Sequence, residues 1–133
     1  MVIDTSAIVA AIAGEPDHAL YRDAIKAADI RLLSAVTLLE TQIVLFARLG
    51  PDAINIFNEL IDRADVTVVP FDGALAEVAF QAYRTFGKGR GHPAQLNIID
   101  CVAYALARAR GLPLLFEGLD FGRTDITPAL VTE

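Results

Sequence analysis

Short aliphatic runs alternate along this chain with longer segments of helical periodicity, and this alternation is the strongest constraint on its fold. The short runs lie at residues 1–4, 30–35, 66–70 and 112–116. The segments between them predict helices over residues 5–14, 15–30, 35–50, 52–64, 71–87 and 97–110. Strands that alternate with helices usually pair in parallel and are covered on both faces. We therefore expect an α/β fold, a three-layer α/β/α sandwich with a mostly parallel central sheet.

Polar and small residues mark where several of these helices begin and end. Ser34 and Asn97 are suitable N-caps, because their side-chain oxygens can accept a hydrogen bond from a free backbone N–H. Gly50 and Gly111 stand where a helix is expected to stop. The apolar face of residues 15–30 is expected to consist of Ala19, Leu20, Ile25 and Ala28. After residue 116 we expect a loop that leads to a short edge strand near Ile126.

Length and composition fit one compact domain. At 133 residues the chain can form one hydrophobic core, and no linker or repeat interrupts it. We expect a single domain over residues 1–133. The hydrophobic share is 54%, yet no apolar run approaches the roughly 18 residues that cross a bilayer. We therefore expect no membrane segment, and we expect a partner to cover some apolar surface.

The cysteine content and the N-terminus indicate a compartment. No signal peptide is recognisable, and the one cysteine, Cys101, excludes an internal disulfide. Both observations favour a reducing, cytoplasmic setting. Cys101 is typical of a small buried hydrophobic residue rather than a reactive thiol, and His18 of an exposed helix position.

The net charge of −6 argues against generic binding to a phosphate backbone, which depends on a surplus of Lys and Arg. A site where carboxylates hold metal cations would reverse the sign of the local field. Any nucleic-acid function of this acidic chain therefore needs such a local explanation.

Four acids are candidates for that site: Asp4, Glu40, Asp100 and Asp120. Asp4 and Asp120 follow predicted strands, and the carboxyl ends of parallel strands share one edge of a sheet. The helical neighbours of Glu40 are largely apolar, which predicts that it lies on a stripe facing the core. The neighbours of Asp100 include no Lys or Arg. Such acids raise one another's pKa unless a divalent cation neutralises them, and oxygen ligands alone favour Mg²⁺ or Mn²⁺.

Each acid also has an ordinary structural interpretation. Asp4 is a possible N-cap, and Asn97 with Asp100 fits a capping box at the start of a helix. Glu117 and Asp125 lie in the same segment as Asp120, and either is an alternative to it. Glu40 has no such interpretation, because it lies in the middle of a helix.

Four segments in order, "VIDTSAIVA", "SAVTLLE", "LNIIDCVAYALA" and "LLFEGLDFGRTDI", resemble the PIN-domain ribonucleases, specifically VapC toxins of toxin–antitoxin pairs. The resemblance spans the chain. It implies that Asp4, Glu40, Asp100 and Asp120 are the catalytic, metal-binding acids, supported by Thr5 or Ser6 and by Asn97. Asp100 or Asp4 would also orient or deprotonate the attacking water. Many relatives have a small residue where this chain has Ile99, which affects only local packing.

The resemblance also implies an activity and partners. Such toxins hydrolyse phosphodiester bonds of structured RNA, such as tRNA or rRNA, with Mg²⁺ or Mn²⁺ as cofactor. They form homodimers and are inhibited by a small VapB-like antitoxin. The one locally basic stretch, "YRTFGKGRGHP", then offers Arg84, Lys88 and Arg90, with His92, as candidate RNA contacts; a solvated loop is the alternative.

Three other functions are alternatives to this one. A receiver-type phosphoacceptor domain needs a second acid beside Asp4, and a haloacid-dehalogenase-type phosphatase needs Asp-x-Asp, which Ser6 interrupts. A non-catalytic adaptor or dimerisation domain of the same fold has no need of all four acids. A metal-dependent endoribonuclease is therefore the function that the sequence favours.

Overall fold

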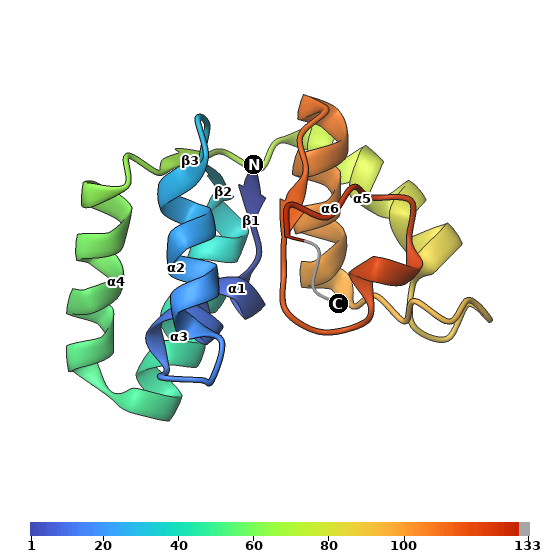
Figure 1. Cartoon of the computed structure of the whole chain (residues 1–133). Coiled ribbons are helices and arrows are strands. Elements are labelled where there is room, and N and C mark those ends of the chain that lie inside the picture. The colour runs from blue at the N-terminus through green and yellow to red at the C-terminus, as the bar shows by residue number, and fades with distance from the viewer. Residues whose placement is uncertain (131–133) are drawn as a thin grey trace.

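The structure, a computed structural model, describes residues 1–130 and forms three layers (Figure 1). Its strands are β1 (Val2–Ile3), β2 (Leu32–Ser34), β3 (Thr67–Val69) and β4 (Leu114–Leu115). Its α-helices are α1 (Thr5–Ile12), α2 (His18–Ala27), α3 (Ala35–Leu49), α4 (Pro51–Arg63), α5 (Gly73–Phe86) and α6 (Ile98–Arg110). A 3₁₀ turn, η1 (Phe121–Arg123), follows β4.

The strands form a parallel sheet in the order β3-β2-β1-β4. Helices α1 to α4 lie on one side of it and α5 and α6 on the other, as Figure 1 shows. This arrangement confirms the predicted α/β/α sandwich. In the described residues no helix is long and apolar enough to cross a membrane.

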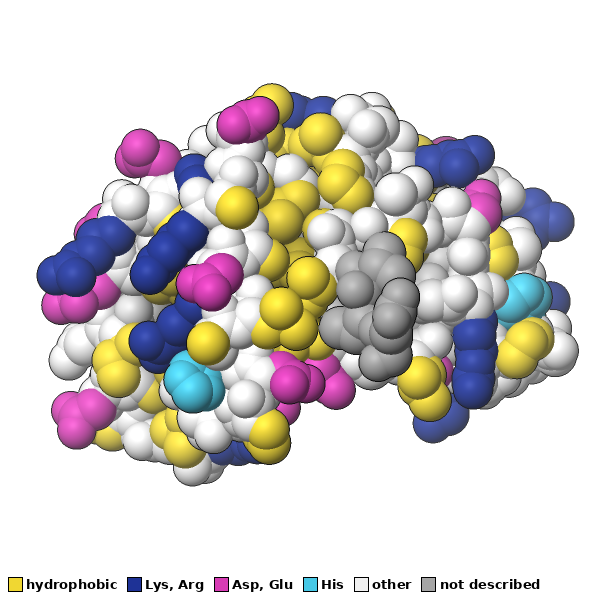
Figure 2. All heavy atoms as spheres, viewed as in Figure 1, with side chains coloured by type: hydrophobic (Ala, Val, Ile, Leu, Met, Phe, Trp, Pro, Cys, Tyr) yellow, Lys and Arg dark blue, Asp and Glu magenta, His cyan; other side chains and the backbone are white. Residues whose placement is uncertain are grey.

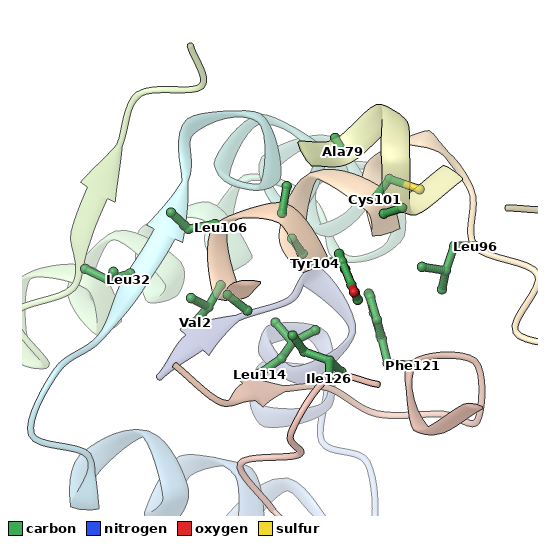
Figure 3. Close-up of a cluster of buried hydrophobic side chains, with 14 of the residues drawn as sticks. Val2, Leu32, Ala79, Leu96, Cys101, Tyr104, Leu106, Leu114, Phe121 and Ile126 are labelled. Atoms are coloured by element: carbon green, nitrogen blue, oxygen red, sulfur yellow. The ribbon is translucent and has the colours of Figure 1, made fainter. Parts of the chain in front are cut away.

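Successive strand residues point to opposite faces of the sheet, so each strand supplies two cores. Val2, Leu32 and Leu114 pack against α5 and α6, in the core drawn in Figure 3. Their neighbours Ile3, Leu33 and Leu115 pack on the other face, where α1 to α4 contribute residues such as Ile25, Leu45 and Phe57. Both faces of β1, β2 and β4 are therefore covered, and all of their residues are buried, whereas the edge strand β3 exposes Thr67 and Val68.

The expected caps are present. Ser34 accepts a hydrogen bond from Val36 N, and Asn97 accepts one from Asp100 N. Gly50 ends α3, and Gly111 ends α6 with a left-handed φ of 62°, a conformation that favours glycine. These local signals therefore fix the ends of the two helices that carry Glu40 and Asp100.

Two local predictions are wrong. Helix α2 starts at His18 rather than at residue 15, and its buried residues are Tyr21 and Ile25, while Leu20 is 41% exposed. No strand forms near Ile126. The chain there makes a single parallel bridge between Leu114 and Pro128, in which Leu114 N donates to Thr127 O and Ala129 N donates to Leu114 O, both at 2.9 Å.

Candidate metal centre and active site

The candidate site lies where the strand order reverses, between β1 and β4. From β1 the chain adds β2 and β3 on one side, and β4 joins the other side of β1. Asp4 N donates to Leu115 O across 2.9 Å, so the segments that leave β1 and β4 start side by side. In open α/β sheets such a switch point leaves a crevice at the carboxyl ends of the strands, and ligands bind there.

Asp4 caps α1 and is almost fully buried, with 4% of its surface exposed. Its Oδ2 accepts hydrogen bonds from Ser6 N at 3.0 Å and from Ser6 Oγ at 2.6 Å. Burial raises the pKa of Asp4; the bonds from Ser6 oppose this, and the negative charge of Glu40 adds to it. The predicted N-cap therefore exists, and it does not remove the cost of burying this carboxylate.

Ser6 connects the first acid to the loop after β4. Its hydroxyl donates its single proton to Asp4 and accepts a hydrogen bond from Glu117 N at 2.9 Å. The predicted supporting hydroxyl is therefore in contact with Asp4. The bond from Glu117 N also fixes the start of the segment that carries Asp120.

Glu40 is half-buried in the second turn of α3, and its charge reaches Asp4. The prediction that its helix stripe faces the core holds in part: Thr37 is fully buried and Val44 packs against the core, whereas Ile43 is 59% exposed. Glu40 instead lines an open groove of about 200 Å³ together with Val36, Leu39, Ile43 and Ile99. The carboxylate therefore stands at an opening where a ligand can reach it.

Asp100 interacts electrostatically with the other three acids. Burial raises its pKa to about 6; the bond from Asn97 N opposes this, and the charges of Asp4, Glu40 and Asp120 add to it. Because such effects decline with distance, the structure brings these acids from four segments into one neighbourhood. The capping box is also present, with 2.9 Å from Asn97 N to Asp100 Oδ2 and 2.8 Å from Asp100 N to Asn97 Oδ1. Asn97 thus orients Asp100.

The structure separates Asp120 from its two alternatives. Asp120 is exposed and contributes to the field at Asp100. The charge of Glu117 instead acts on Tyr21, whose pKa is raised by burial and by that charge. Asp125 accepts a hydrogen bond from Tyr104 Oη at 2.5 Å and pairs with Arg108 at 3.3 Å. Of the three, Asp120 alone is coupled to the other acids.

The donor chemistry of these acids fits Mg²⁺ or Mn²⁺. In residues 1–130 no Lys or Arg forms an ion pair with any of the four. Within the same residues, no three His, Cys, Asp or Glu side chains stand close enough to hold one ion together. The acids thus share a neighbourhood without forming a closed cage. Mg²⁺ suits such a site, because it keeps several waters and is usually bound through one or two carboxylates.

Thr5 does not face the acids. Its Oγ1 lies 3.0 Å from Thr41 Oγ1 of α3, and Thr41 Oγ1 donates to Thr37 O at 2.7 Å. All three threonines are buried. The sequence gives no signal for this contact, because residues 5 and 41 are joined only by the packing of two helices.

The predicted basic loop is exposed and lies beside the segment that carries Asp120. Lys88 N donates to Leu96 O and Leu96 N to Phe86 O, which closes the loop. Arg123, which the sequence analysis did not single out, donates to Pro93 O at 3.2 Å and so joins η1 to this loop. Arg84, Lys88 and Arg90 form no ion pair within the described residues and remain candidate phosphate contacts.

The fold also assembles a second basic surface that no stretch of sequence predicts. Lys and Arg side chains gather over α2 and α4 on the left of Figure 2. The groove between these helices has a volume of about 340 Å³, and its charged residues are Arg22, Lys26, Arg31, Arg63 and Glu59, of which Arg63 and Glu59 pair with each other. A larger, apolar groove of about 570 Å³ lies along α5 and the start of α6. It shares Val36 and Ile99 with the groove beside Glu40, so the two form one apolar surface.

The remaining single residues agree with their predictions. Cys101 is buried, and burial raises the pKa of its thiol to about 11, which disfavours a reactive thiolate. His18 is exposed, and its Nδ1 lies 3.0 Å from Glu15 O. Neither residue takes part in the acidic site.

Comparison with known proteins places this geometry in a family. The PIN domain family model matches residues 1–126, and the chain belongs to the PIN-domain family. Its relatives include Ribonuclease VapC28 of Mycobacterium tuberculosis, 47% identical over 130 residues that cover 98% of each chain. Ribonuclease VapC30 of the same species is 47% identical over 126 residues, 95% of each chain. Ribonuclease VapC42 is 41% identical over 129 residues, 97% of this chain and 98% of that one.

A solved structure confirms the fold. The crystal structure of Mycobacterium tuberculosis VapC20, described as a Sarcin-Ricin loop cleaving toxin, matches with a TM-score of 0.78 and 21% identity over 95% of each chain. The relatives that are 41–47% identical over nearly the whole chain confirm the resemblance to VapC ribonucleases. The receiver and dehalogenase-type alternatives are wrong, because the matched family is a different one.

Proposed function

We propose that this protein is a metal-dependent endoribonuclease, the toxin of a toxin–antitoxin pair, which hydrolyses phosphodiester bonds of structured RNA such as tRNA or rRNA. One observation carries the proposal: four carboxylates from four segments act on one another at the switch point of the sheet, and no Lys or Arg of the described residues neutralises them. The VapC ribonucleases, 41–47% identical over nearly the whole chain, support it.

In this proposal Asp4, Glu40, Asp100 and Asp120 share the binding of Mg²⁺ or Mn²⁺: one or two of these carboxylates would contact an ion directly, and the others would act through its waters. A bound divalent ion lowers the pKa of a coordinated water and stabilises charge on the leaving oxygen. Ser6 and Asn97 orient Asp4 and Asp100 through the bonds described above. Asp100 or Asp4 would also orient or deprotonate the attacking water.

The RNA would approach from the side of the basic loop. Arg84, Lys88 and Arg90 are exposed there, and Arg123 ties the loop to the segment of Asp120. Contacts from these cations to phosphates would position the strand, while the acidic site selects the bond that is cut. This division of roles accounts for a nuclease whose net charge is −6.

The apolar surface of α3 and α6 supports a homodimer contact. Leu39, Ile43 and Phe46 recur at helical spacing on the outer side of α3, with 57%, 59% and 60% of their surface exposed. Ile98 of α6 is 75% exposed beside the same surface. We assign this face to a homodimer contact. The proposal has three further parts. A VapB-like antitoxin inhibits the enzyme. The enzyme acts in the cytoplasm, and residues 1–133 act as one domain.

The proposal is tested by incubating antitoxin-free protein and RNA with Mg²⁺ or Mn²⁺, and with a chelator as control. We expect cleavage only with metal, and a loss of at least about a hundredfold in Asp4→Asn and Asp100→Asn. Asp120→Asn is paired with Glu117→Gln, a matched change in the same loop, and only the former should lose activity. Equal cleavage by wild type and Asp4→Asn would refute the site. A wild type that cleaves no RNA would favour the non-catalytic adaptor.

A further inference from the structure

Buried hydroxyls connect α1, which follows Asp4, to α3, which carries Glu40. Thr5 comes directly after Asp4 in sequence, and Thr41 comes directly after Glu40. Their Oγ1 atoms lie 3.0 Å apart, with Thr5 7% exposed and Thr41 fully buried. This contact spans 36 residues. It is the one hydrogen bond between α1 and α3 in the described part of the chain.

The number of hydroxyl protons determines the direction of these hydrogen bonds. Thr41 Oγ1 donates its single proton to Thr37 O at 2.7 Å. The proton between the two hydroxyls must therefore come from Thr5, which donates to Thr41. The result is an ordered sequence, from Thr5 hydroxyl to Thr41 hydroxyl to the backbone of α3, in which each bond polarises the next.

The rest of the contact between α1 and α3 lacks such direction. The buried residues of α1 beyond Thr5 are Ala7, Ile8, Val9, Ala10 and Ala11. Apolar contacts are non-directional, and three of these five side chains are alanines that offer little surface for interlocking. A hydrogen bond between buried hydroxyls depends on both distance and angle. The Thr5–Thr41 bond is thus the directional constraint on how α3 lies along α1.

We propose that the Thr5–Thr41 hydroxyl pair is a positioning device that sets the placement of Glu40 relative to Asp4 and so tunes metal binding. The inference rests on the proposed function. Neither threonine hydroxyl forms a hydrogen bond with an acid, so both hydroxyls act through the backbone of their helices. A small shift of α3 along α1 would move Glu40 relative to Asp4, whose carboxylate is held by the hydrogen bonds from Ser6.

Thr37 supplies a matched control. It lies on the same buried side of α3 one turn before Thr41, and its Oγ1 has no hydrogen-bond partner among the described residues. Thr37→Val therefore removes a buried hydroxyl of the same kind without breaking a bond. Thr41→Val, Thr5→Val, the double variant and Thr41→Ser complete the set.

The experiment measures Mn²⁺ binding by calorimetry without RNA, and thermal unfolding without metal, for each variant. Thr41→Val strands the Thr5 hydroxyl, so we expect both the unfolding temperature and the Mn²⁺ affinity to fall. In the double variant no hydroxyl is stranded, so the unfolding temperature recovers. Its Mn²⁺ affinity stays about tenfold weaker, the lower end of the range for residues that support metal ligands. Thr41→Ser and Thr37→Val should bind Mn²⁺ like wild type.

Two results would overturn the inference in distinguishable ways. If the double variant regains wild-type Mn²⁺ affinity together with its stability, the hydroxyl pair is a packing feature and does not position the acids. If wild-type protein itself binds no Mn²⁺, the proposed function fails and the inference fails with it. RNA cleavage gives a further readout, because a positioning role lowers kcat at fixed Mn²⁺ and leaves KM for RNA unchanged.

Discussion

Asp100→Asn is expected to stabilise the metal-free protein at neutral pH while it abolishes activity. Burial and three neighbouring acids raise the pKa of Asp100 from 3.8 to about 6. The folded state therefore binds a proton at this group more tightly than the unfolded chain does. Wild-type stability must then fall as pH rises from about 4 to about 6, and the whole penalty remains above that range.

The size of the effect follows from the pKa difference. A difference of about two corresponds to about 3 kcal/mol. Partial exposure of Asp100 screens this value, and a negative charge in the first turn of α6 is favourable by up to about 1 kcal/mol. We therefore expect a net gain of about 1–2 kcal/mol in the free energy of unfolding. Asparagine can still accept the bond from Asn97 N, so the capping box survives.

Chemical unfolding at about pH 4 and about pH 7.5, without metal, measures this gain. Asp100→Asn should equal wild type at the lower pH and exceed it at the higher one. Asp23→Asn, which removes one exposed charge from α2, is the control for the change of charge. Added Mg²⁺ should stabilise wild type and leave Asp100→Asn almost unchanged, because a bound ligand stabilises only the state that holds it. A variant less stable than wild type at the higher pH would refute the reasoning.

Two further changes test other parts of the molecule. Ile43→Glu should convert the proposed dimer to a monomer in light scattering, because it places a charge on the apolar face of α3; Arg48→Glu on the same helix is its control, and an unchanged mass for Ile43→Glu would assign the contact to another face. Tyr104→Phe should lower the free energy of unfolding by about 1–2 kcal/mol, because it leaves Asp125 without the bond from its hydroxyl; denaturant unfolding measures this, and wild-type stability would contradict it.

Local signals predicted most of the fold. The strand positions follow from aliphatic runs with turn residues beside them, and α3 and α6 begin and end at the residues that can cap them. The failures lie where tertiary contacts decide. Periodicity did not distinguish the buried Tyr21 from the exposed Leu20, because that choice depends on which side of α2 packs against α1.

The sequence predicted which residues form the site better than it predicted the hydrogen bonds that connect their segments. A strand end, a mid-helix acid and a helix N-terminus are visible in sequence, so the grouping of the four acids could be expected. The bond from Glu117 N to Ser6 spans 111 residues, and the Thr5–Thr41 contact spans 36. No local pattern encodes such pairs, because they exist only once the helices and strands have packed.

The shortness of the strands has a consequence for how this protein tolerates change. β1 and β4 are two residues long, so each contributes a single side chain to either core. Longer strands carry several side chains per face, and a neighbour can compensate for one that is altered. Here there is no such redundancy. Random substitution should therefore be least tolerated at Val2, Ile3, Leu114 and Leu115, and variation should concentrate on the outer turns of the helices.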